Sequence, residues 1–133
     1  MNNENSNADL GPVIYSYTRS QAIADGFQIE VTKTAAEAGI RFPVFITRGV
    51  YEQCVAVPPG VTGQDEAGRL WDIVWMLRFA IRKAQPNQTR LPFALYVRND
   101  NQRARLTKLI ATCGPLDVGD PQPAITIMLP DED

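Results

Sequence analysis

The most regular pattern of apolar and polar positions runs from Thr62 to Ala84 and predicts one long amphipathic helix, at about residues 63–84. Thr62 and Asp65 form the capping-box pattern of a helix start, and Pro86 marks the end. At helical spacing, one apolar stripe is formed by Ala67, Leu70, Trp71, Val74, Leu77 and Ile81. The stripe is widened at its margins by Ile73, Ala80, Ala84, Trp75 and Phe79. The opposite side, which the pattern places in solvent, carries Arg69, Asp72 and Lys83.

Two residue types in this helix bear on function. Trp71 is expected in the core, whereas Trp75 lies at the margin of the stripe. Arg78 falls inside the apolar stripe, so its guanidinium must pair with an acid, stack on an indole or extend to water. One interpretation is a structural ion pair, and the other is an anion-binding arginine beside an aromatic wall. Arg82, one turn further on, favours the second, since two cations do not both satisfy one buried acid.

Apolar runs and period-two alternation predict a set of strands. Residues Phe27 to Val31 alternate strictly, which indicates a half-buried strand with Phe27, Ile29 and Val31 inward. Pro43 in the extended segment Phe42–Ile46 favours a sheet edge or a segment outside the sheet. Further strands are predicted at Val13–Tyr15, Leu91–Arg98, Arg103–Cys113 and Ala124–Leu129. The second and third of these form a hairpin, and the Gly- and Pro-rich residues 114–123 are expected to be a loop.

Short helices are predicted in the first half of the chain. Thr18 and Gln21 form a capping box, with Gly26 as the stop signal. A second helical turn is expected at Thr32–Ala38, and Thr47 caps a third that places Val50 and Cys54 on one face. The predicted fold is α+β: an antiparallel sheet of about five strands with the long helix packed on one face. The expected organisation is a disordered tail (1–12), one domain (13–130) and an acidic, solvated tail (131–133).

Composition removes several kinds of chemistry. The 133 residues include no histidine, which excludes Ser-His-Asp and Cys-His catalysis and His-containing zinc sites within this chain. Cys54 and Cys113 are too few for a four-thiolate zinc site, and we expect both to be reduced, mostly buried thiols. No cofactor and no metal ion is expected, because no phosphate-binding glycine loop or calcium loop occurs. No segment approaches the apolar length of a membrane span, and the N-terminal residues do not resemble a signal peptide.

Charge is distributed unevenly along the chain. Residues 67–108 contain nine basic and two acidic side chains, whereas the flanking regions are acidic and the total is −2. Arg103 and Arg105 are expected on one face of a strand, beside the basic end of the long helix. Such a basic middle region indicates an anionic partner, although a solvated surface that protects sheet edges is the alternative. No helix-turn-helix, zinc-finger or RNA-binding aromatic signature is present.

Four segments resemble a family of small uncharacterised bacterial proteins encoded on plasmids, integrative elements and in phage-associated gene sets. These are VIYSYTRSQAIADG (13–26), FPVFITRGVYEQCV (42–55), QDEAGRLWDIVWMLRFAIRKA (64–84) and ITIMLPDED (125–133). The resemblance implies an accessory role for a mobile element in the bacterial cytoplasm. It implies no catalytic residues.

From these observations we expect a non-enzymatic interaction protein that binds an acidic protein partner. The predicted binding residues are Arg78, Arg82, Trp75, Phe79, Arg103 and Arg105. A nucleic-acid binder that uses the same basic surface is the alternative. A third hypothesis is an enzyme that uses carboxylates and tyrosines, which would require Asp65, Glu66 or Asp72 to cluster with Tyr15 or Tyr17 in a deep pocket.

Overall fold

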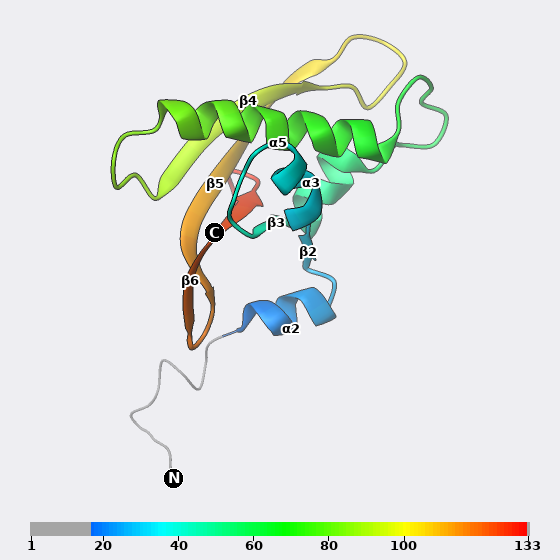
Figure 1. Ribbon diagram of the computed structural model, residues 1–133. Coiled ribbons are helices and arrows are strands. Elements are labelled where there is room, and N and C mark those ends of the chain that lie inside the picture. The colour runs from blue at the N-terminus through cyan, green and yellow to red at the C-terminus, as the bar shows by residue number, and fades with distance from the viewer. Residues whose placement is uncertain (1–16, 133) are drawn as a thin grey trace.

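The computed structural model describes residues 17–132. Its strands form one five-stranded sheet in the order β2-β3-β6-β5-β4, and the long helix α5 crosses one face of it (Figure 1). The elements in chain order are α2 (Arg19–Ala24), β2 (Gln28–Glu30), α3 (Thr32–Glu37), β3 (Val44–Thr47), α4 (Arg48–Val50), the π-helical turn η1 (Tyr51–Val55), α5 (Glu66–Lys83), β4 (Arg90–Val97), β5 (Arg105–Asp117) and β6 (Asp120–Met128). The expectations for residues 1–12 and for the strand Val13–Tyr15 lie outside the described residues.

The α+β prediction, with about five strands and one helix on a face, is confirmed. The sheet is mostly antiparallel, but β3 and β6 run parallel, with Val44 opposite Ile125 and Ile46 opposite Ile127. β4 and β5 form the predicted hairpin, in which Phe93 lies opposite Leu109. The last strand, β6, therefore lies in the middle of the sheet and joins the hairpin to the first half of the chain.

The segment 114–123 is not the predicted loop, because β5 and β6 continue through it. Pro115 lies opposite Pro123, and the chain reverses at Gly119, whose φ of 81° suits a tight turn. β4 pairs with β5 only as far as Thr112, and β3 pairs with β6 only from Ile125 onward. Both prolines therefore lie in a two-stranded extension with free outer edges, where a missing N–H breaks no pairing.

Two other strand predictions are corrected. Phe27 does not face the core: β2 begins at Gln28, Phe27 is exposed, and the guanidinium of Arg48 stacks over its ring at 4.9 Å. Pro43 does not mark a sheet edge either. It immediately precedes β3, which lies between β2 and β6, and its carbonyl accepts a hydrogen bond from the Ile125 N–H at 2.9 Å. A proline before the first residue of an interior strand leaves the ladder intact.

The predicted capping box is confirmed for α2, whereas the predicted start of α5 is three residues too early. Thr18 and Gln21 form the predicted capping box of α2. The cap of α5 is Asp65, whose Oδ1 accepts from the Gly68 N–H at 2.7 Å, so the helix begins at Glu66. The backbone N–H of Thr62, by contrast, donates to the turn of the β4–β5 hairpin.

The core lies between α5 and the sheet. The helix buries Ile73, Val74 and Leu77. These side chains belong to one buried cluster with residues of four strands: Val44 and Ile46 of β3, Leu95 of β4, Leu109 of β5 and Ile127 of β6. The buried face is rotated relative to the predicted stripe. Trp71 is 37% exposed, so its expected core position is wrong, and Arg69, expected in solvent, is only 5% exposed.

The opposite face of the sheet is covered at one end by α2. The Arg19 guanidinium lies 4.2 Å from the centroid of the Phe45 ring and donates to Thr126 Oγ1 at 2.9 Å. Asp117 at the end of β5 accepts from the backbone N–H groups of Arg19 and Ser20 and so binds the start of α2 to the sheet. These contacts bury Phe45 and Thr126 on the side away from α5.

The acidic end of the chain is partly built into the fold. Glu132 Oε1 accepts from Thr47 Oγ1 at 2.7 Å and from the Leu129 N–H at 2.8 Å, so this residue is not the solvated group that the sequence indicated. Asp131 is exposed. The two thiols also differ from expectation: both are free, but only Cys54 is buried and Cys113 is exposed.

Candidate binding face

Aromatic side chains gather on the outer side of α5. Trp71 and Trp75 stack with ring centroids 5.8 Å apart, and Phe79 meets Trp75 edge-on at 6.1 Å. The three residues follow at intervals of four, so they form a ladder along one side of the helix. Each is more than a third exposed. We call these three rings, together with Arg78 and Arg82, the arginine–aromatic face.

Arg78 stacks on this ladder. Its guanidinium carbon lies 5.0 Å from the centroid of the Trp75 ring, within the range of a cation–π contact. Within residues 17–132 it forms neither an ion pair nor a side-chain hydrogen bond. Arg78 therefore does not form the expected structural ion pair within the described part of the chain. It stacks on an indole, as the other interpretation expected.

Gly39 gives Arg78 the room to lie there. This glycine follows α3 with φ of 92°, and a Cβ atom on it would lie 3.3 Å from Arg78 Nε. A left-handed C-terminal glycine is the usual way to end a helix, and here it also lets a long side chain pass. The end of α3 thus positions the guanidinium from one side while Trp75 supports it from the other.

A hollow of ≈ 390 Å³ opens beside this contact, between α5 and the segment that leads into β3. Arg41, Arg78 and Arg82 all line it. Like Arg78, the other two arginines form no ion pair or side-chain hydrogen bond within residues 17–132. Arg41 is not among the binding residues predicted from the sequence. Only the approach of α3 to α5 brings it near the other two, and no local pattern marks that approach.

The hairpin arginines lie elsewhere. The turn after β4 packs on the loop before α5, because Arg98 donates to the Thr62 carbonyl and Asn101 donates to the Gly60 carbonyl (Figure 1). Arg103 and Arg105 accordingly lie near the N-terminal end of α5, whereas Arg82 is about 24 Å further along the helix. Arg105 is exposed and lies 3.7 Å from Asp100. The structure brings four of the six predicted binding residues together and separates the hairpin pair from them.

Arg69 holds the other end of α5. Its Nε donates to the Cys54 carbonyl at 3.0 Å, and its two amino groups reach the Arg98 carbonyl at 2.8 Å and Asn99 Oδ1 at 2.6 Å. Burial lowers the pKa of Arg69, but a guanidinium stays charged at neutral pH. Since these acceptors belong to η1 and to the β4–β5 hairpin, Arg69 ties two distant segments to α5. Its role is structural.

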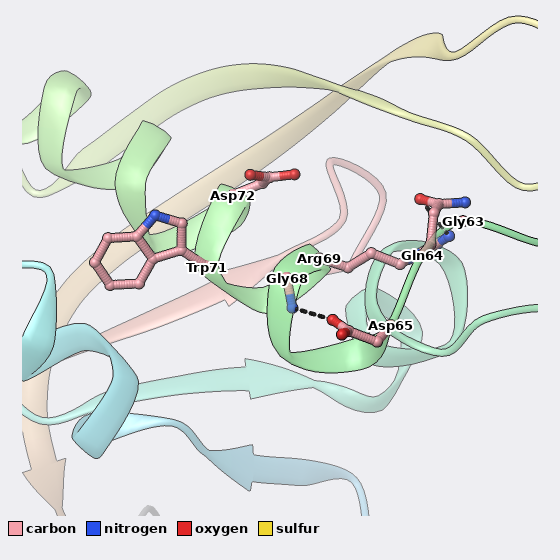
Figure 2. A pocket seen from close by; sticks show the side chains of 7 residues that line it. All are labelled: Gly63, Gln64, Asp65, Gly68, Arg69, Trp71 and Asp72. Carbon is pink, nitrogen blue, oxygen red and sulfur yellow. Dashed lines mark hydrogen bonds between the residues drawn. The ribbon is translucent and has the colours of Figure 1, made fainter.

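A second hollow, of ≈ 590 Å³, lies at the N-terminal end of α5. Figure 2 shows that the Arg69 side chain extends toward Gln64, whereas the side chains of Trp71 and Asp72 extend away from Arg69. Asp65 already satisfies the Gly68 N–H at this helix end. The donors of Arg69 are also used, so neither Arg69 nor the Gly68 N–H is available to a ligand there.

Two residues of the enzyme hypothesis, Glu66 and Tyr17, are each hydrogen-bonded to a residue outside that hypothesis. Tyr51 donates to Glu66 Oε2 at 2.9 Å, and Tyr17 donates to Asp25. Each hydrogen bond to a carboxylate raises the pKa of its phenol. Asp65 is the helix cap described above, and Tyr15 lies outside the described residues. Among residues 17–132, Asp, Glu and Cys side chains form no group of three that could hold a metal ion.

Comparisons with known proteins give one result. A family model described as a family of unknown function, DUF6573, matches residues 1–133. Neither the curated proteins nor the solved structures include a significant match. In the part of the chain that the structure describes, no helix is long and apolar enough to cross a membrane.

Proposed function

Because the chain belongs to DUF6573, a family of unknown function, we propose its function from its own residues: it is a non-enzymatic interaction protein that binds an acidic protein partner on the arginine–aromatic face. The observation that carries this proposal is the contact of Arg78 with Trp75. A guanidinium that has no acidic partner among residues 17–132 and is held against an exposed indole is ready to pair with a carboxylate from outside.

The surroundings of this contact support the proposal. Exposed aromatic rings and arginines are the residues that contribute most to binding at protein interfaces, and here they alternate along one helix. Arg41 and Arg82 add positive charge beside Arg78. A carboxylate shared among three cations gains charge-assisted hydrogen bonds without displacing an existing partner.

The experiment measures how tightly a fluorescent, glutamate-rich acidic peptide binds to the wild-type protein and to its variants. We expect Arg78→Ala and Arg82→Ala each to weaken peptide binding about tenfold or more, with the melting temperature nearly unchanged. Arg105→Ala is the matched control, because Arg105 is exposed at the opposite end of α5. Equal weakening by Arg105→Ala, or a large fall in melting temperature with binding intact, argues against the proposal.

The alternative is a nucleic-acid binder that uses the same arginines, and the additional basic hairpin with Arg103 and Arg105 favours it. Its mark is a steep fall in affinity with rising salt, since binding releases counterions from phosphates. A duplex DNA probe measured in parallel with the peptide at low and moderate salt separates the two functions. The acidic balance of the whole chain, −2, favours the protein partner.

We further propose that this interaction serves a mobile genetic element in the bacterial cytoplasm. The support is the resemblance of residues 13–26, 42–55, 64–84 and 125–133 to proteins encoded on plasmids, integrative elements and in phage-associated gene sets. Co-purification of a tagged chain from a bacterium that carries such an element, with and without nuclease, tests this proposal. The partner must then be a protein whose recovery survives nuclease treatment.

A further inference from the structure

An apolar hollow lies next to the three arginines, between the C-terminal half of α5 and the sheet. Leu77 and Ile81 contribute from α5, Leu91 from β4, Cys113 from β5, and Phe42 closes it from the segment before β3. The volume is ≈ 170 Å³. The lining consists mostly of apolar side chains, and Cys113, which contributes to it, is free and exposed.

The size of this hollow restricts what can fill it. Drug-sized and cofactor-sized ligands occupy pockets of about 300–1,000 Å³, which is too large. An apolar cavity of about 150 Å³ holds a benzene molecule. The hollow therefore accommodates a single aromatic or branched aliphatic side chain.

The hollow continues into the arginine-lined one. Phe42 and Ile81 line both of them, so the two hollows are adjacent, and one chain segment can place an apolar side chain in the first while it extends over the second. Its neighbouring residues then lie beside Arg41, Arg78 and Arg82. Those guanidiniums have no acid among residues 17–132, and complementary charge on the incoming segment must therefore be negative.

We propose that the partner presents a short acidic segment with one apolar anchor residue, and that the anchor occupies the hollow between Leu77, Ile81, Leu91 and Cys113. This inference rests on the proposed function and specifies its partner. The carboxylates supply orientation at the arginines, and the buried anchor supplies affinity. A nucleic acid has no apolar side chain of this kind to insert.

The test uses two synthetic acidic peptides that differ only at the central residue, which is phenylalanine in one and glycine in the other. Burial of the ring should make the phenylalanine peptide bind about tenfold more tightly. It should also slow the reaction of Cys113 with N-ethylmaleimide, while the glycine peptide should not. The readout is specific to Cys113, since Cys54 is buried and burial raises the pKa of the Cys54 thiol.

Alkylation supplies a matched control without disturbing the fold. Protein alkylated at Cys113 should lose the preference for phenylalanine, because Cys113 lines the hollow and the maleimide adduct occupies space there. Cys113→Ala treated in the same way should keep the preference. Equal binding of the two peptides overturns the anchor inference while leaving the proposed function in place. Binding of neither peptide, together with salt-sensitive binding of duplex DNA, overturns both.

Discussion

The guanidinium of Arg78 lies over the face of Trp75, 5.0 Å from the ring centroid, on the outer side of the helix that builds the core. The same helix thus has two separate tasks. Ile73, Val74 and Leu77 hold the sheet from one side. Trp75 and Arg78 lie on the other side, where the indole is more than a third exposed. A helix whose only role was to pack on the sheet would have polar, weakly interacting side chains on that side.

The first prediction separates these two sides by stability. Leu77 is fully buried, so Leu77→Ala should lower the free energy of unfolding by about 2–5 kcal/mol. Trp75 is more than a third exposed and contacts mainly its neighbours on α5, so Trp75→Ala should cost much less, about 1 kcal/mol. Urea denaturation followed by circular dichroism measures both. Comparable losses would show that Trp75 supports the core.

The second prediction concerns Arg69. Arg69→Leu keeps only part of the aliphatic stem and removes the donors to the buried Cys54 carbonyl and the partly buried Arg98 carbonyl. Leaving such acceptors unsatisfied should cost about 3–5 kcal/mol of unfolding free energy. Arg82→Leu is the control, because Arg82 is exposed on the outer side of the same helix. If Arg69→Leu were as stable as the control, the tie between η1 and the hairpin would contribute little.

The third prediction tests how Gly39 positions Arg78. Gly39→Ala places a Cβ atom 3.3 Å from Arg78 Nε and should displace the guanidinium from Trp75. Gly60→Ala is a matched control, since Gly60 also has positive φ, 82°, but nothing lies within 4 Å of its Cβ position. Both variants should lose about 1 kcal/mol from backbone strain. Only Gly39→Ala should change tryptophan fluorescence and weaken the acidic peptide.

The fourth prediction is a pH dependence that arises from Asp117. The Ser20 hydroxyl, with the backbone N–H groups of Val118, Arg19 and Ser20, lowers the pKa of Asp117 from 3.8 to about 2. A carboxyl whose pKa falls on folding stabilises the protein at pH values above 3.8, and this contribution decreases as the pH falls and is lost below about 2.

Asp117→Asn should therefore reduce stability at neutral pH and flatten the decline of stability between pH 4 and pH 2. Urea midpoints measured across this range supply the test. Asp72→Asn is a suitable control, because Asp72 is exposed on α5 and has no hydrogen bond among residues 17–132. Parallel curves for the wild-type protein and Asp117→Asn would mean that the Asp117 carboxyl does not titrate as described.

Local chemistry explains which parts of the fold were predictable. The capping box of Thr18 and Gln21 is satisfied within one helical turn, so sequence alone identifies it. The β4–β5 hairpin follows from two apolar runs around a polar turn. Neither depends on distant residues, and both were predicted correctly.

The errors on α5 come from contacts made across the chain. Arg69 is buried because the Cys54 and Arg98 carbonyls surround it, and those groups are 15 and 29 residues away. Trp71 is exposed although its residue type is common in cores. Hydrophobicity gave the period of the helix correctly but not its rotation, because a buried arginine and exposed aromatic rings contradict the usual scale. The position of Arg41 beside Arg78 also depends on a contact across the chain, because only the approach of α3 to α5 brings the two arginines together.

The central position of β6 has a consequence for how the chain acquires its structure. β3 and β6 pair across about 80 residues, and the hairpin reaches the first half of the sheet only through β6. During synthesis, a nascent polypeptide that has not yet emerged past Met128 has two half-sheets that share no strand pairing. Closure must await the last strand, and such distant pairing makes folding slow. A ribosome that stalls before this point leaves a product whose β3 and β5 edges are both open to aggregation.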